Sequence, residues 1–204
     1  MITFACHVCQ KQFNVPDSYA GRRARCKGCA NEVRVPVPAP AQDKTPELSR
    51  PPLRVRRLMS DADAVKIAFS NHPHVRVQST VGDPAETYRF TFKVKGLTRD
   101  AKGRPAALNE HVAEIQLGAD YPRLPPVCKM ISPIFHPNID TSYICIGDHW
   151  TAGERLVDLV TRIAEMIGYQ AYNIRSPLDG EAAMWADLNA SKLPLDATSF
   201  TIGR

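Results

Sequence analysis

Six cysteines are the residues of this 204-residue chain best able to do chemistry, and their spacing divides them into two kinds. Four lie in two pairs, Cys6/Cys9 and Cys26/Cys29, with the spacing C-x2-C-x16-C-x2-C. Four thiolates spaced in this way are the ligand set of a tetrahedral structural zinc site. We therefore predict that Cys6, Cys9, Cys26 and Cys29 bind one zinc ion, and that residues 1–35 fold around it.

Two disulfides are the alternative to a metal site. The first residues, MITFACHVCQ, lack a basic segment followed by an apolar stretch, so nothing in them indicates secretion. No apolar run approaches the roughly 18 residues of a membrane span. We therefore expect a cytoplasmic protein in a reducing compartment, where paired cysteines bind metal. His7 is a less favoured ligand, because four cysteines already complete a tetrahedral shell.

The remaining two cysteines differ in their setting. Cys128, in VCKM, alternates with the charged Lys129 and has the pattern of a strand residue in the core. Cys145, in PIFHPNIDTSYICIGDHW, stands where turn-forming residues break the chain direction. The thiolate is the nucleophilic form of cysteine. We interpret Cys145 as reactive, with a buried core thiol as the alternative.

The hydrophobic pattern predicts the elements that position Cys145. Apolar residues between Leu58 and Phe69, including Met59, follow one helical stripe. The segment Ser60-Asp61-Ala62-Asp63 is a candidate N-cap, which leaves the start of this helix open. Residues 72–81, 86–96, 110–118 and 125–132 have strand-like sequence, with a polar loop over residues 96–109. Strands that follow one another without intervening helices favour an antiparallel meander.

Two helices are predicted after this meander. Thr151 to Glu154 has the sequence of a capping box, and apolar residues then recur at helical spacing from Leu156 to Ile167. SPLDGEAAMWADLN predicts a last helix capped by Asp179. The expected fold class is α+β, with a four-stranded antiparallel meander packed by helices and a small zinc-ribbon module before it.

The charge and proline distributions divide the chain into three parts. Residues 36–52 hold six prolines and predict an extended linker, so residues 53–204 form the expected second domain. Residues 1–35 have a net charge of +4 and residues 53–204 of +1. Four thiolates and one zinc ion together carry about two negative charges, so the ribbon would be only mildly basic. Nucleic acid is therefore not an expected partner.

Residues 53–190 resemble the ubiquitin-conjugating enzymes. The motifs that carry the resemblance are YPRLPP (121–126), FHPNI (135–139), IC (144–145), Trp150 and SPLDGEAA (176–183). The resemblance implies a UBC-like domain that receives a ubiquitin-like protein from an activating-type enzyme as a thioester on Cys145. Transfer to an amine of a target, usually a lysine, follows. The cysteine-pair segment resembles small ribbons found at the start of many bacterial proteins, which implies a bacterial pathway.

The same resemblance implies roles for the residues around the thiol. Asn138 is the donor that stabilises the oxyanion of acyl transfer, and it also, or instead, braces the loop. His136 fixes that loop by hydrogen bonds, with a base as the less favoured role. Ser176 assists at the mouth of the cleft, and its alternative role is a turn residue before a helix. A Cys-His pair with His149 is less favoured, and catalysis needs no cofactor.

Two departures from the family pattern bear on partners. The gap from Asn138 to Cys145 is seven residues, one shorter than usual, and Arg123 replaces an aromatic residue on the loop that meets ligases. The target is therefore expected to be reached directly or through a ligase of unspecified type. By resemblance, the first helix docks the activating enzyme, which assigns the basic residues 54, 56 and 57 to that contact.

Two other functions fit parts of the sequence. A cysteine hydrolase would use Cys145 with His136 or His149, but this hypothesis explains neither Asn138 nor the YPRLPP motif. A non-catalytic scaffold would hold a ubiquitin-like protein without a covalent bond while the ribbon recruits a target. The presence of Cys145 favours the conjugating enzyme over this scaffold.

Overall fold

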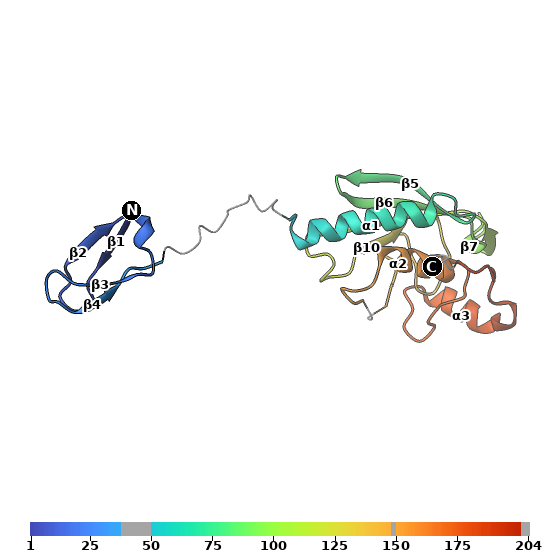
Figure 1. Cartoon of the computed structure of the whole chain (residues 1–204). Coiled ribbons are helices and arrows are strands. Elements are labelled where there is room, and N and C mark those ends of the chain that lie inside the picture. The colour runs from blue at the N-terminus through green and yellow to red at the C-terminus, as the bar shows by residue number, and fades with distance from the viewer. Residues whose placement is uncertain (38–49, 148–149, 201–204) are drawn as a thin grey trace. The chain divides into compact units, whose positions relative to one another are not determined.

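The computed structural model describes residues 1–37, 50–147 and 150–200 (Figure 1). Its contacts divide the chain into two compact units, Met1–Arg50 and Pro51–Arg204, which we describe separately. Most of the linker predicted over residues 36–52 lies outside the described residues. The described helices include none that combines the length and apolar character needed to cross a membrane.

The first unit consists of two short antiparallel hairpins. Strand β1 (Ile2–Ala5) pairs with β2 (Gln12–Val15), and β3 (Arg23–Arg25) pairs with β4 (Glu32–Arg34), with a 3-10 turn, η1 (Asp17–Tyr19), between the hairpins. The buried centre contains little more than Cys6, Cys26 and Val33, against which Phe4 and Phe13 pack. An apolar core of so few side chains cannot hold a fold by itself.

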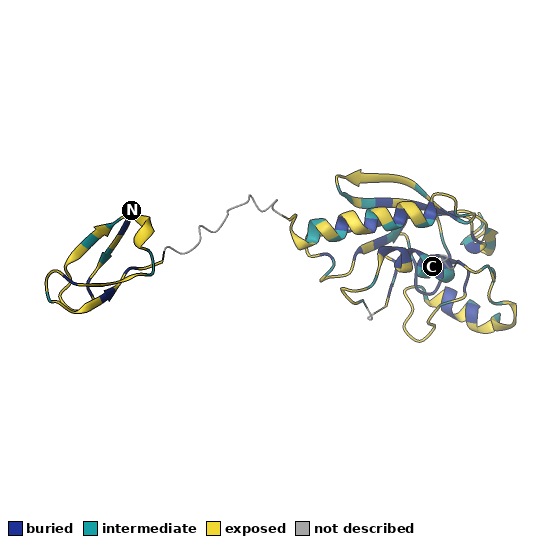
Figure 2. Cartoon of the chain, viewed as in Figure 1, coloured by how far each residue is buried: buried dark blue, intermediate teal, exposed yellow. Residues whose placement is uncertain are grey.

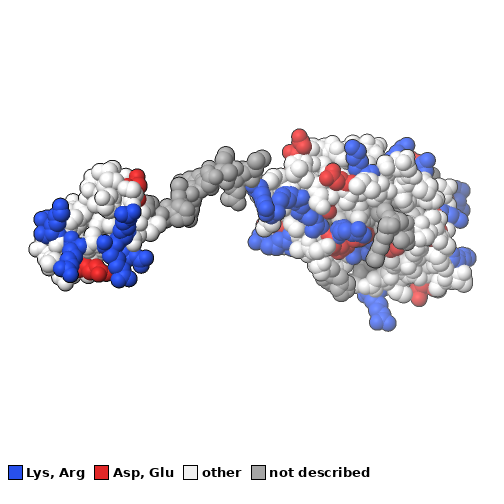
Figure 3. Space-filling view, in the orientation of Figure 1, with Lys and Arg blue, Asp and Glu red and all other residues white. Residues whose placement is uncertain are grey.

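Lys and Arg side chains gather on the visible face of this first unit (Figure 3).

The second unit begins with helix α1 (Leu53–Phe69) and continues into a four-stranded antiparallel sheet in the order β10-β9-β6-β5. The strands are β5 (Val75–Gly82), β6 (Ala85–Phe92), β9 (His111–Gln116) and β10 (Val127–Met130). Helices α2 (Leu156–Ile167) and α3 (Gly180–Leu188) and a 3-10 turn, η2 (Ala190–Lys192), follow. The predicted α+β class and the antiparallel meander are confirmed.

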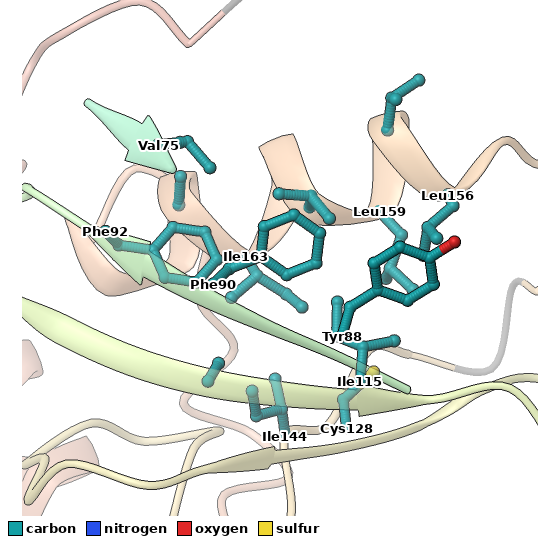
Figure 4. Close-up of a cluster of buried hydrophobic side chains, with 14 of the residues drawn as sticks. Val75, Tyr88, Phe90, Phe92, Ile115, Cys128, Ile144, Leu156, Leu159 and Ile163 are labelled. Atoms are coloured by element: carbon teal, nitrogen blue, oxygen red, sulfur yellow. The ribbon is translucent and has the colours of Figure 1, made fainter. Parts of the chain in front are cut away.

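The core lies between α2 and the sheet (Figure 4). Tyr88, Phe90 and Phe92 alternate along β6 and are each at most 1% exposed, as the period-two pattern predicts. The apolar stripe of α2 packs against them, and Figure 2 shows α2 as largely buried. Cys128 is fully buried here, and burial raises the pKa of its thiol to about 12. It is the core residue that its strand pattern predicted.

The predicted polar loop over residues 96–109 is wrong. A hairpin of β7 (Gly96–Arg99) and β8 (Pro105–Leu108) forms there instead. Leu97 is buried in a second apolar cluster with Phe135, and its carbonyl accepts the Phe135 N–H at 2.8 Å. A Cβ on Gly96 would lie 2.8 Å from His111 Nε2, so this close approach requires glycine. The hairpin thus supports the segment that leads to the His-Pro-Asn motif.

The candidate N-cap at residues 60–63 does not form. The helix begins at Leu53, so Ser60 and Asp61 lie in its interior, and Met59 is exposed. Asp61 is buried, and its Oδ2 accepts hydrogen bonds from Arg57 Nε at 2.7 Å and from the Tyr121 hydroxyl at 2.6 Å. The Asp61 carboxylate therefore binds tertiary partners instead of capping a helix, although its sequence has the pattern of a local cap.

The capping box predicted before α2 does not form. Thr151 to Glu154 makes a turn, with Glu154 N–H on the Thr151 carbonyl at 3.0 Å, and the helix begins later, at Leu156. Asp61 Oδ1 faces the Leu156 N–H at 3.5 Å, so a carboxylate from α1 lies at the start of α2. The Asp179 cap of α3 is confirmed, because its Oδ1 accepts from Ala182 N–H at 3.0 Å.

Residues 193–200 return to the core after η2. The Leu195 N–H bonds the Gly168 carbonyl at 3.0 Å, and Gln170 Nε2 donates to the carbonyls of Asp196 and Thr198. Phe200 is 1% exposed within the main core. This extended segment therefore closes the end of α2.

Candidate active site

A tight reversal of the chain brings Cys145 back to the His-Pro-Asn motif. Ile139 and Ile144 form an antiparallel bridge, and the Asp140 N–H donates to the Tyr143 carbonyl at 2.9 Å. Asp140 Oδ1 also accepts from the Ser142 and Tyr143 N–H groups at 2.7 and 2.6 Å, a side-chain turn typical of aspartate. Hydrogen bonding from Ser142 lowers the pKa of Asp140, so the turn is held by a carboxylate.

This reversal fixes the position of the thiol. The Cys145 N–H donates to the Asn138 carbonyl oxygen at 2.9 Å, and the Ile144 N–H donates to the Cys128 carbonyl at 2.8 Å. Cys145 is partly exposed, whereas Ile144 and Ile146 on either side are buried. The buried neighbours anchor the segment and leave the thiol at the surface of a cavity.

His136 is buried beneath the loop. Its Nδ1 accepts the Asn138 N–H at 3.0 Å, and the ring meets the edge of Tyr169 at 4.6 Å between centroids. Burial lowers the pKa of His136 to about 3, so the imidazole is neutral. With Nδ1 accepting a backbone hydrogen bond, the proton lies on Nε2 and no ring lone pair is free. This geometry favours the loop-fixing role over the base.

The Asn138 side chain links the loop to a second segment. Its Oδ1 accepts the Asn173 N–H at 2.6 Å, and its Nδ2 lies 2.8 Å from the Asn173 carbonyl and 3.4 Å from the Ser176 carbonyl. An amide group has two N–H donors, and both are engaged here. Asn138 is 4% exposed. Its contacts favour the bracing alternative over a free oxyanion donor.

The backbone of Pro137 adds a second connection to the same segment. Its carbonyl oxygen accepts the Leu178 N–H at 2.7 Å and the Asp179 N–H at 3.2 Å. Ser176 is exposed, next to these contacts and before α3. The residues between Asn173 and Asp179 are therefore held against the His-Pro-Asn motif.

A cavity of about 360 Å³ opens beside the thiol. Its lining includes Asn138, Cys145, Asn173 and Ser176, together with Arg162 and Met166 from α2. Three of the four residues predicted to be catalytic thus meet at one cavity, and His136 supports them from below. His149, the less favoured base, lies outside the described residues.

The sequence interpretation missed the network that holds this region to α1. Arg57 donates to the Ala152 carbonyl at 2.6 Å, to the Glu154 carbonyl, and to the Tyr121 hydroxyl at 3.0 Å. The i,i+4 spacing of Arg57 and Asp61 was the one local signal of it. Arg54 likewise bonds the Gly118 carbonyl at 3.0 Å, so of the basic residues 54, 56 and 57 only Arg56 is exposed.

The four N-terminal cysteines form the candidate metal centre. All four Sγ atoms lie within 4.8 Å of one another, with Cys6–Cys29 at 3.7 Å and Cys9–Cys26 at 3.5 Å. Tetrahedral zinc–thiolate bonds place sulfurs about 3.8 Å apart, whereas a disulfide needs about 2.05 Å. All six cysteines are free thiols. The donor set therefore fits a zinc ion, and His7 is not part of the cluster.

Comparisons with known proteins agree with these motifs. The model of the ubiquitin-conjugating enzyme family matches residues 60–194. Ubiquitin conjugating enzyme E2 B of Dictyostelium discoideum is 32% identical over 95 residues, which are 45% of this chain and 63% of that protein. Ubiquitin-conjugating enzyme E2-20 kDa of Schizosaccharomyces pombe is 28% identical over 112 residues, 52% of this chain and 53% of that protein.

The chain thus spans less than two thirds of the length of either relative. A solved structure described as a novel ubiquitin-conjugating enzyme has the same fold. It superposes with a TM-score of 0.50 at 20% identity, and the match covers 67% of this chain and 86% of that one. With the family model matching well over half of its residues, this chain belongs to the ubiquitin-conjugating enzyme family and carries, before its UBC-like domain, a four-cysteine ribbon.

Proposed function

We propose that the chain carries a ubiquitin-like protein as a thioester on Cys145 and transfers it to an amine, normally a lysine, of a target. The observation that carries this proposal is the partly exposed thiol, bonded through its N–H to the Asn138 carbonyl at 2.9 Å and open to a cavity. A thiol used only for packing would be enclosed, as Cys128 is.

The reaction has two acyl transfers. The Cys145 thiolate attacks the carbonyl carbon of a thioester held by an activating-type enzyme, and that enzyme's thiolate leaves. A substrate amine then attacks the new thioester, negative charge builds on the carbonyl oxygen, and the carbon–sulfur bond breaks. The amide forms, the nitrogen gives up a proton to water, and the Cys145 thiolate is regenerated.

The neighbouring residues have supporting roles in this proposal. Asn138 and His136 hold the loop, since their polar atoms contact the backbone of residues 138, 173 and 176. Ser176 stands at the mouth of the cavity, where an amine would enter. The four N-terminal cysteines bind a structural zinc ion, which stabilises the ribbon and takes no part in the transfer.

The partners follow from the family and from the ribbon. They are a ubiquitin-like protein, an activating-type enzyme that docks near α1, and a target reached directly or through a ligase. The ribbon supports a bacterial ubiquitin-like pathway in the cytoplasm. Of the three basic residues first assigned to the activating enzyme, we keep Arg56 alone, because Arg54 and Arg57 bond within the domain.

The test is formation of a reductant-sensitive adduct with the cognate activating enzyme, ubiquitin-like protein and ATP. Cys145→Ala abolishes the adduct, whereas Cys145→Ser traps an oxyester that resists reductant, because an alkoxide leaves less readily than a thiolate. Cys128→Ala is the matched control and charges normally. Binding without any adduct would establish the scaffold instead, and cleavage of the partner without transfer would establish a hydrolase.

A further inference from the structure

Arg162 is the one residue with a charged side chain among the described residues that line the Cys145 cavity. It lies in the middle of α2, between the buried core residues Val160 and Ile163. Its side chain is 30% exposed, so the guanidinium stands between the protein interior and the cavity. An arginine is always charged, and a charge in a partly dry cavity acts more strongly than one in water.

The contacts of Arg162 leave its charge only partly compensated. Nη2 lies 2.8 Å from Glu154 Oε1, and the Glu154 side chain is 15% exposed. Arg162 Nε is buried and has no hydrogen-bond partner in the described part of the chain. A buried donor without a partner destabilises the fold, which calls for a role of this arginine beyond packing. Glu154 positions the guanidinium and does not saturate it.

The cavity lining offers no other positively charged donor among the side chains described. Both N–H groups of the Asn138 amide point to the carbonyls of Asn173 and Ser176. The other lining residues with a polar side-chain hydrogen, Tyr172, Asn173 and Ser176, have neutral side chains, so none of them offers a charged donor. Arg162 is therefore the one described cation in the lining of this cavity.

We propose that Arg162 supplies the positive electrostatic potential of the Cys145 cavity and stabilises the negative charge that develops on the carbonyl oxygen when an amine attacks the thioester. This inference rests on the proposed function. In that step the amine nitrogen bonds the carbonyl carbon and gives up a proton to water, the C=O electrons move to oxygen, and their return expels the Cys145 thiolate. Arg162 exchanges no proton, and Glu154 is a positioning residue.

The potential at Cys145 can be measured without any partner protein. Iodoacetate, which is an anion, and iodoacetamide, which is neutral, both alkylate the same thiolate. The ratio of the iodoacetate rate to the iodoacetamide rate therefore cancels the degree of ionisation of the thiol and reports the charge around it. The ratio is followed at Cys145 by peptide mass spectrometry in the full chain. We expect Arg162→Gln to lower the ratio by about threefold and Glu154→Gln to raise it.

Two variants control for folding and net charge. Arg162→Lys keeps the charge and retains most of the ratio. Arg155→Gln removes the same charge from the exposed start of α2, where Arg155 pairs with Asp158 at 2.6 Å, and leaves the ratio unchanged. An Arg162→Gln ratio equal to that of the unmodified chain overturns the proposal. If Arg162→Gln does not fold, a Glu154→Gln ratio that does not rise overturns it as well.

Single-turnover discharge of the preformed thioester tests the catalytic half. Arg162→Gln should charge normally but discharge to an amine about 10–100-fold more slowly, with partial recovery in Arg162→Lys or on addition of guanidinium ion. Glu154→Gln should slow discharge less than Arg162→Gln does, because the guanidinium keeps its charge and loses only its positioning partner. Equal losses in both variants, together with equal losses of melting temperature, would show a structural ion pair only. Failure of the unmodified chain to form any thioester would refute the proposed function, while the alkylation ratio still decides the charge at Cys145.

Discussion

The Cys145 N–H is hydrogen-bonded to the Asn138 carbonyl oxygen at 2.9 Å, while the Asn138 side chain bonds the backbone of Asn173 on the opposite side. One residue thus joins the segment of the nucleophile to the segment that leads into α3. The seven-residue gap between Asn138 and Cys145 is closed by the Asp140 turn, so the shortened loop keeps the two residues adjacent.

Asn138→Ala should therefore impair both charging and discharge. Three side-chain hydrogen bonds are lost, which should lower the free energy of unfolding by about 1.5–4 kcal/mol. Urea unfolding and single-turnover kinetics are measured together, with Asn109→Ala, at an exposed position, as the control. A stable Asn138→Ala protein that charges normally but discharges about 10²–10³-fold more slowly would instead identify Asn138 as the oxyanion donor.

Zinc removal should unfold the ribbon and spare the UBC-like domain. The buried apolar centre of the first unit is a few side chains, so metal binding supplies most of its folding free energy. We expect one zinc ion per chain by metal analysis, and chelation should increase amide exchange in residues 1–35 alone. Cys6→Ser should reproduce this effect, and Cys128→Ala should not. Reduced, freshly purified protein without zinc would contradict the assignment.

Asp61→Ala should be among the most destabilising single substitutions in the domain. It removes the acceptor of Arg57 Nε and of the Tyr121 hydroxyl, and leaves a largely buried guanidinium without its carboxylate. Breaking a buried ion pair costs about 3–5 kcal/mol. Asp63→Ala, at an exposed position of the same helix, should change the free energy of unfolding by less than about 0.5 kcal/mol. Comparable losses in the two variants would disprove this role for Asp61.

Acid should weaken the domain through His136. Burial lowers the pKa of this residue from 6.5 to about 3 in the folded chain. Between these values the unfolded state binds more protons than the folded state, so the free energy of unfolding falls as the pH falls, by up to about 1.4 kcal/mol per pH unit.

His136→Asn offers the control, because a side-chain oxygen can accept the Asn138 N–H without titrating. Its free energy of unfolding should change less between pH 6.5 and 4 than that of the unmodified chain, as followed by urea unfolding at several pH values. Parallel pH profiles for the two proteins would show that His136 does not titrate on unfolding.

Local patterns were enough to predict much of this protein. The spacing of the cysteine pairs, the alternation along β6 and the apolar stripe of α2 each lie within one segment of chain, and each predicted its element correctly. The motifs around Cys145 predicted the family for the same reason, since a motif is a short run of residues with its own order and spacing.

Tertiary structure decided what depends on partners distant in sequence. Aspartate is a residue type typical of helix caps, but Asp61 is buried. Its hydrogen-bond donors come from Tyr121 and Leu156, which lie 60 and 95 residues away in the sequence. The sequence of residues 96–109 predicts a polar loop, yet Leu97 from this segment is buried in the second apolar cluster. No local motif singles out Arg162 in the sequence, and only the packing of α2 brings it to the cavity of Cys145. Sequence periodicity records which face of an element is buried, whereas the partner that buries it is set by the packing of the whole domain.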